Sequence, residues 1–191
     1  MKVLALDTAT EACSAALSVD GAVSERYEVI GRGHAERLLP MVQELLAEAG
    51  LALAALDGIA FGRGPGSFTG LRIGAGVTQG LAFGVGLRVA PVSDLAALAS
   101  RAATLRGERF VLACLDARMA QVYWAAYDCA DPAAPVALTP EAVSDPGAVW
   151  LPEEIGDIPI FLSGAGERGH RSEDKKGKKE CPQFFGVGHG F

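Results

Sequence analysis

The sequence is poor in the side chains that bind transition metals. Its 191 residues include three histidines and four cysteines. Of the three histidines, only His34 lies before residue 166. There is no H-E-x-x-H motif and no C-x-x-C pair, whereas a zinc site needs three or four clustered ligands. The sequence therefore predicts no metal-binding residues, no zinc peptidase, and buried, reduced thiols at Cys13, Cys114, Cys129 and Cys181.

Long apolar runs and positive charge are also scarce. No run of about 18 apolar residues is present, so no membrane-spanning helix is predicted, and the start of the chain turns acidic too early for a signal peptide. Residues 1–165 carry 19 Asp and Glu against 11 Lys and Arg. We therefore expect a cytoplasmic protein without a membrane partner, and one that contacts RNA only through another protein.

Strand and helix patterns alternate along the chain, which predicts an α/β fold in two lobes, 1–107 and 108–166. An Asp-Gly pair predicts a hairpin turn, and a strand that ends in aspartate occurs twice, at Asp7 and at Asp116. The expected strands are 2–8, 12–20, 22–30, 57–62, 88–92, 110–115, 121–128 and 158–163, and the expected helices are 34–49, 70–86 and 94–106.

The helix expected at 34–49 has an apolar arc of about 160° when residues are placed ~100° apart. Pro40 fits best in the first turn of a helix, so this helix is expected to begin after His34. Gly50 is expected to end it.

The chain changes in composition near residue 166. No alanine or leucine follows Ala165, lysine replaces arginine as the main basic residue, and Arg171–Glu180 is a charge run. Such a segment favours disorder, and we expect 167–191 to be a disordered or frame-shifted tail, with an interaction tail as the alternative. The second lobe would then be incomplete.

A glycine-rich loop at 64–74 connects a strand to a helix. It lacks the Gly-Lys-Ser/Thr of a P-loop and the spacing of the dinucleotide fingerprint. Two interpretations stay open: a helix capped by Ser67 or Thr69, or an anion site at the helix N-terminus.

The stretch 6–10, LDTAT, resembles the first phosphate loop of the actin, sugar kinase and Hsp70 superfamily. Aspartates at two strand ends are suited to Mg²⁺, but they could equally accept hydrogen bonds from turn amides. No cofactor is required by this pattern, and ATP or ADP with Mg²⁺ is the ligand it would take. The candidate nucleotide-binding residues are Asp7, Thr8, Thr10, Ser67 and Asp116.

Three glycines recur every four residues in the helix expected at 70–86. Gly76, Gly80 and Gly84 share one face, and each costs the helix about 1 kcal/mol relative to alanine. They permit close approach either of the chain's own sheet or of a helix from another subunit.

Four motifs together resemble the TsaB (YeaZ) family over residues 1–166: LALDTAT, HAERLLPMVQELL, GRGPGSFTGLRIG and LDARMAQVYWAAY. The resemblance implies an actin-like, ribonuclease-H-like fold. It also implies a non-catalytic scaffold subunit in the synthesis of threonylcarbamoyladenosine in tRNA, paired with the catalytic subunit TsaD and working with the ATPase TsaE. Older labels for such proteins are glycoprotease and M22 peptidase.

The family pairs through its first two helices, with a homodimer in isolation. The resemblance thus implies an interface at Leu38, Met41, Val42, Leu45, Gly76, Gly80 and Gly84. Two alternatives remain: a stand-alone actin-like ATPase or sugar kinase, and a metallopeptidase.

Overall fold

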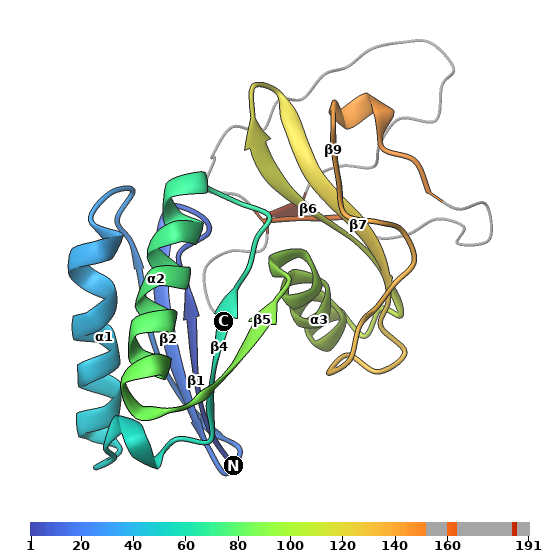
Figure 1. Cartoon of the computed structure of the whole chain (residues 1–191). Helices are drawn as coiled ribbons and strands as arrows, with labels where there is room; N and C mark the ends of the chain where they lie inside the picture. The colour runs from blue at the N-terminus through green and yellow to red at the C-terminus, as the bar shows by residue number, and fades with distance from the viewer. Residues whose placement is uncertain (152–159, 164–184, 187–191) are drawn as a thin grey trace. The chain divides into compact units, whose positions relative to one another are not determined.

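The computed structural model describes residues 1–151, 160–163 and 185–186. The chain divides into two compact units, Met1–Asp94 and a second unit that begins at Leu95 (Figure 1). Among the described residues, no helix is long and apolar enough to cross a membrane.

The first unit is built on a five-stranded sheet in the order β3-β2-β1-β4-β5. The first three strands form an antiparallel meander, and β4 and β5 run parallel to β1. Both residues of the predicted turn, Asp20 and Gly21, have positive φ angles of 50° and 93°, as a type I′ hairpin turn requires. The strands are β1 (Lys2–Asp7), β2 (Ala12–Val19), β3 (Ala22–Val29), β4 (Gly58–Gly62) and β5 (Arg88–Val92).

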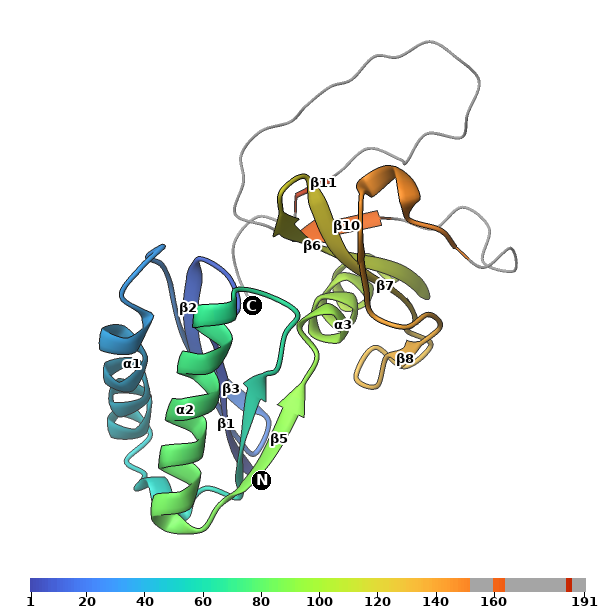
Figure 2. The ribbon, with the colours of Figure 1, turned by 45° about the horizontal axis from the view of Figure 1, so that its top comes forward.

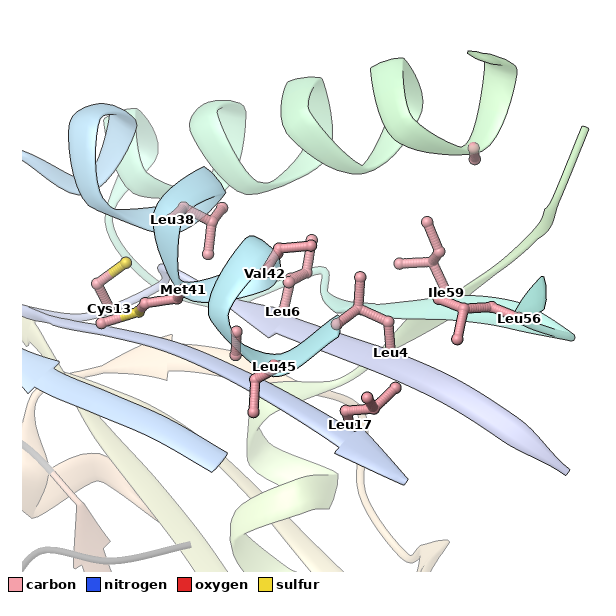
Figure 3. Close-up of a cluster of buried hydrophobic side chains, with 12 residues drawn as sticks. Leu4, Leu6, Cys13, Leu17, Leu38, Met41, Val42, Leu45, Leu56 and Ile59 are labelled. Atoms are coloured by element: carbon pink, nitrogen blue, oxygen red, sulfur yellow. The ribbon is translucent and has the colours of Figure 1, made fainter. Parts of the chain in front are cut away.

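Two helices, α1 (His34–Glu48) and α2 (Phe68–Val85), lie on the same side of these strands (Figure 3); a short 3₁₀ turn (Leu53–Ala55) precedes β4. Alternate residues of a strand point to opposite faces, so one face of the sheet meets the helices. The core between them is formed by Leu4, Leu6, Leu17 and Ile59 of the strands and Leu38, Met41, Val42 and Leu45 of α1.

Helix α1 begins at His34, earlier than expected, with Pro40 inside it. Proline lacks an N–H, so the carbonyl of Glu36 loses its partner four residues on. Burial of the apolar side of α1 in the core outweighs that loss. The predicted C-terminal end is confirmed, because Gly50 has a φ of 62° and its N–H donates to the carbonyl of Ala47.

A network of ion pairs ties the outer strand β3 to α1. Arg37 bonds Glu28 at 2.6 Å and Glu44 at 2.7 Å, and Arg26 bonds Glu44 at 3.0 Å and also Glu48. Hydrogen bonds from Arg37 lower the pKa of both Glu28 and Glu44. The charged side chains of β3 are thereby held against the helix, which is one way proteins protect a sheet edge.

The second unit contains α3 (Asp94–Arg106) and a six-stranded sheet in the order β11-β10-β6-β7-β8, with β9 also paired to β7 (Figure 2). A 3₁₀ turn (Pro146–Ala148) follows β9. Strand β10 runs parallel to β6, and residues 158 and 159 of the expected strand lie outside the described residues. The strands are β6 (Phe110–Arg118), β7 (Gln121–Asp128), β8 (Val136–Ala137), β9 (Ala142–Ser144), β10 (Ile160–Ser163) and β11 (Phe185–Gly186).

Helix α3 packs on one face of this sheet, with Leu95 and Ala99 buried beside Val111 and Ala125. The division between the units therefore falls after the first residue of α3, whereas the predicted lobe boundary at 107 follows the helix. On the opposite face Trp124 donates a hydrogen bond to Ser144 Oγ at 2.9 Å and meets Trp150 edge-on, with 6.0 Å between ring centroids. The predicted lobe end at 166 lies outside the described residues. Of the predicted tail 167–191 only Phe185 and Gly186 are described, and they form β11, which pairs with β10.

Candidate functional site

The first candidate feature is the turn that follows β1. Asp7 Oδ1 accepts a hydrogen bond from the N–H of Ala9 at 2.7 Å. Burial raises the pKa of the Asp7 carboxyl, although the N–H groups of Ala9 and Thr8 and the charge of His34 act in the opposite direction. The strand-end aspartate therefore serves the turn itself, which is the second of its two predicted uses.

The start of α2 is hydrogen-bonded directly to this turn. Thr8 Oγ1 donates to the carbonyl of Gly70 at 2.8 Å, and the N–H of Ser67 donates to the carbonyl of Ala9 at 2.7 Å. A Cβ atom added at Gly70 would lie 1.9 Å from the carbonyl oxygen of Thr8. One added at Gly66 would lie 2.4 Å from the carbonyl oxygen of Ala9. These glycines let two backbone segments of the same chain meet.

The predicted phosphate-binding hydroxyls are all engaged nearby. Thr8 is buried and bonded to α2, Ser67 Oγ accepts from the N–H of Gly70 at 3.4 Å as the N-cap of α2, and Thr10 Oγ1 accepts from the N–H of Ala12 at 3.1 Å. The predicted capping by Ser67 is confirmed. The space opened by the glycines is filled by the chain's own backbone, which favours the capped-helix interpretation of the loop over the anion site. A phosphate role for these hydroxyls stays a prediction.

The same turn also contacts α1. His34, the first residue of α1, is buried, and its Nε2 lies 3.1 Å from the carbonyl oxygen of Thr10. The turn 7–11 is thus clamped between the first residues of both helices, so that the helices and the turn form one packed assembly.

Asp94 joins Asp7 at the carboxyl ends of the parallel strands. A Cβ at Gly62 would lie 2.8 Å from Asp7 Oδ1 and 2.4 Å from Asp94 Oδ1, so two carboxylates converge there. Asp94 was not among the site residues predicted from the sequence. Its place directly after the strand beside β4 was the signal that could have found it, because the ends of parallel strands share one edge. No group of three metal-ligating side chains occurs among the described residues.

In the second unit Asp116 repeats the local geometry of Asp7. Its Oδ1 accepts from the N–H of Arg118 at 2.7 Å, but the side chain is exposed. Arg118, Met119 and Ala120 then all have positive φ angles, of 64°, 51° and 61°. Asp7 and Asp116 belong to different units, and their predicted joint role with Mg²⁺ stays a prediction.

The second candidate feature is the predicted helical interface, and its α1 half requires a correction. Leu38, Met41, Val42 and Leu45 are 0–2% exposed in the core, so they are not available to a partner. A charge at Leu45 would disrupt the first unit itself instead of only its pairing. The outer side of α1 carries Leu39, which is 40% exposed, together with Glu36 and Gln43.

The α2 half of that interface is open. Gly76, Gly80 and Gly84 are exposed, and a Cβ on any of them would meet no atom within 4 Å. Phe83, which is 91% exposed, lies on the same side of the helix. The opposite side of α2 packs inward through Gly70, Gly74, Thr78 and Ala82. The three glycines therefore do not pack against the chain's own sheet. We call Gly76, Gly80, Phe83 and Gly84 the open face of α2.

A stacked pair lies at the N-terminal end of the same helix. Phe68 is 67% exposed, and the guanidinium carbon of Arg72 lies 3.7 Å from the centre of its ring. Cation–π contact of this kind holds both side chains in place on the surface.

Comparisons with known proteins agree with this architecture. The family described as TsaD, tRNA N6-adenosine threonylcarbamoyltransferase, matches residues 26–150. The *Escherichia coli* (strain K12) tRNA threonylcarbamoyladenosine biosynthesis protein TsaB is 52% identical over 127 residues, which are 66% of this chain and 55% of that protein. The *Haemophilus influenzae* TsaB is 52% identical over 124 residues, 65% of this chain and 52% of that protein.

A solved structure of YeaZ from *Pseudomonas aeruginosa* is 52% identical, with a TM-score of 0.78 over 84% of this chain and 74% of that one. The predicted actin-like α/β fold is confirmed by these likenesses. The chain spans about half the length of the curated relatives it matches.

Proposed function

The chain belongs to the tRNA N6-adenosine threonylcarbamoyltransferase family, within its TsaB (YeaZ) members, and from this premise we propose that it is a non-catalytic partner subunit. It pairs with the catalytic subunit TsaD in the cytoplasm and supports threonylcarbamoyl transfer to tRNA.

The open face of α2 is the observation that carries this proposal. Each exposed glycine costs the helix about 1 kcal/mol relative to alanine, and the chain gains no packing of its own at Gly76, Gly80 or Gly84. A flat strip beside the exposed Phe83 ring lets a partner helix approach closely and cover the ring. The cost of the glycines is then offset in the complex.

The local chemistry supports a scaffold role. The hydroxyls of Thr8 and Ser67, which a phosphate ligand would need, are bonded within the chain. The proposal therefore gives this chain no cofactor and assigns ATP use to the partner TsaE. The excess of acidic residues in 1–165 supports contact with tRNA only through the complex.

Co-purification with the TsaD homologue of the same organism tests the proposal. Gly80→Leu fills the open face and is expected to abolish the complex, whereas Thr104→Leu, at an exposed position of α3, is expected to leave it intact. Circular dichroism checks that both variants stay folded. Reconstituted tRNA modification should need the wild-type chain and should fall with Gly80→Leu. Wild-type complex formation and modification by Gly80→Leu would contradict the proposal.

A further inference from the structure

Helix α2 carries a single charged residue, and that residue lies on its exposed side. Among the 18 residues of Phe68–Val85, only Arg72 is charged. Successive residues are about 100° apart around a helix, so Phe68, Arg72 and Gly76, which are four residues apart, lie on one side of it. Arg72 therefore shares a side of the helix with the open face of α2.

The contact with Phe68 holds the guanidinium of Arg72 and leaves its donors available. The guanidinium carbon lies 3.7 Å from the centre of the Phe68 ring, so the group sits over the ring. The N–H groups of arginine point outward in the plane of the guanidinium. In the part of the chain that the structure describes, no hydrogen bond or ion pair joins them to another residue. The helix thus presents an exposed, positioned cation beside a strip of glycines.

A protein carboxylate is the group that fits this cation best. Arginine binds a carboxylate through two parallel N–H bonds. A nucleic acid fits less well, because one cation neutralises only one phosphate, and residues 1–94 carry ten Asp and Glu against seven Lys and Arg. Helix α2 contains no acidic residue, so α2 of a second copy would bring no counter-ion. The carboxylate must come from a different helix.

We propose that Arg72 forms an ion pair with a carboxylate on the TsaD helix that covers the open face of α2. The inference rests on the proposed function and adds the chemistry and the direction of the partner helix. Arg72 and Phe83 are 11 residues apart, which is about 16 Å along a helix. The partner helix therefore carries an acidic residue at one end of the contact and an apolar residue about 16 Å away, over Phe83. The two backbones come closest between them, at Gly76 and Gly80.

The salt dependence of binding tests the ion pair. Isothermal titration calorimetry measures the dissociation constant of the full chain for the TsaD homologue of the same organism, between about 0.05 and 0.5 M NaCl. Arg72→Glu is expected to raise the dissociation constant by about tenfold or more at low salt. Arg72→Gln removes the charge, so its dissociation constant should be higher than that of the wild type and should depend less on salt.

The conservative variant separates charge from shape. Arg72→Lys keeps the positive charge but loses the flat group that sits over Phe68 and binds a carboxylate with two bonds. Its dissociation constant should retain the salt dependence of the wild type and be about threefold higher.

Arg88→Gln is the matched control within the first unit. The register places Val89 level with the core residue Ile59. Arg88, the residue before Val89, therefore points to the opposite face of the sheet, away from α1 and α2. This variant removes the same charge from another exposed position, so the dissociation constant and its salt dependence should stay as in the wild type.

The outcomes distinguish this inference from the proposed function, and circular dichroism checks that every variant is folded. If Gly80→Leu abolishes the complex while Arg72→Gln binds with the wild-type dissociation constant and salt dependence, the partner role stands and the ion pair is refuted. Equal changes in Arg72→Gln and Arg88→Gln would also overturn the ion pair, because the effect would then come from net charge. A wild-type chain that forms no complex would contradict the proposed function and this inference together.

Discussion

The turn after β1 and the turn after β6 share one local design and differ in what surrounds it. In both, a strand ends in an aspartate whose Oδ1 accepts from the N–H two residues later at 2.7 Å, and an antiparallel strand returns. The first turn is packed under α2 through Thr8 and Gly70. The second is exposed, and Met119 at its tip is 93% exposed.

The difference shows that the same aspartate-to-amide hydrogen bond forms both in a turn that packs against a helix and in a turn that is exposed. Left-handed backbone costs a non-glycine residue about 1–2 kcal/mol, and the second turn carries three such residues in succession. The first turn needs none, because contacts with α2 define its path. Local chemistry therefore specifies that a turn forms, and packing decides how firmly it is held.

Gly70→Ala should break the first turn most severely. The added Cβ would stand 1.9 Å from the carbonyl oxygen of Thr8, so strand end and helix must separate, and we expect a loss of about 3 kcal/mol in the first unit. Hydrogen exchange of the β1 and β4 amides measures it. Gly80→Ala, in open space, should instead stabilise the unit by about 1 kcal/mol. Equal effects of the two substitutions would refute the packing role of Gly70.

Thr8→Val should have an intermediate effect. It keeps the shape of the side chain but removes the hydroxyl that donates to Gly70, leaving that carbonyl without this partner, and we expect a loss of about 1–2 kcal/mol. Thr69→Val, one residue away from that carbonyl and exposed, is the matched control and should change little. Urea unfolding of the two variants, followed by far-UV circular dichroism, compares them.

Asp7→Asn should give an effect of the opposite sign and one with a defined pH dependence. Because burial raises the folded-state pKa of Asp7, its charged form weakens the first unit. Stability is therefore lost as pH rises from the ordinary pKa of about 3.9 through the raised value. Asparagine keeps an acceptor for the N–H of Ala9 and carries no charge, so the variant should be more stable than wild type at pH 7.

The pH series needs the second turn as its reference. Asp116→Asn changes an exposed residue and should alter stability by less than about 0.5 kcal/mol. Urea unfolding between about pH 3 and pH 7 makes the measurement. The prediction would be contradicted if the free energy of unfolding of the wild-type first unit, compared with that of Asp7→Asn, increased as the pH rises through this range.

Elements with strong local signals were predictable from the sequence. The hairpin at Asp20-Gly21, the cap at Ser67 and the glycine end of α1 each depend on chemistry within a few residues. The predicted start of α1 was wrong, because it was based on the low helix propensity of Pro40. Burial of one whole side of the helix outweighs the propensity of that single residue.

Contacts between distant segments were not predictable in the same way. An apolar arc of about 160° does not tell which part of a helix meets its own sheet, so core residues such as Leu45 were assigned to an interface. The glycines of α2 look alike in sequence. Yet Gly70 and Gly74 admit the chain's own turn, whereas Gly76 and Gly80 face open space. What approaches a glycine is decided by the fold.

The tryptophan pair in the second unit has a practical consequence for following this protein by light. Both tryptophans of the chain, Trp124 and Trp150, stand in that unit, while the first unit has Tyr27 as its sole tyrosine and no tryptophan. Tryptophan emission therefore reports on the second unit and does not report unfolding of the first. A Phe83→Trp variant would give the first unit a reporter of its own, and its emission would shift to the blue when a partner covers the open face of α2.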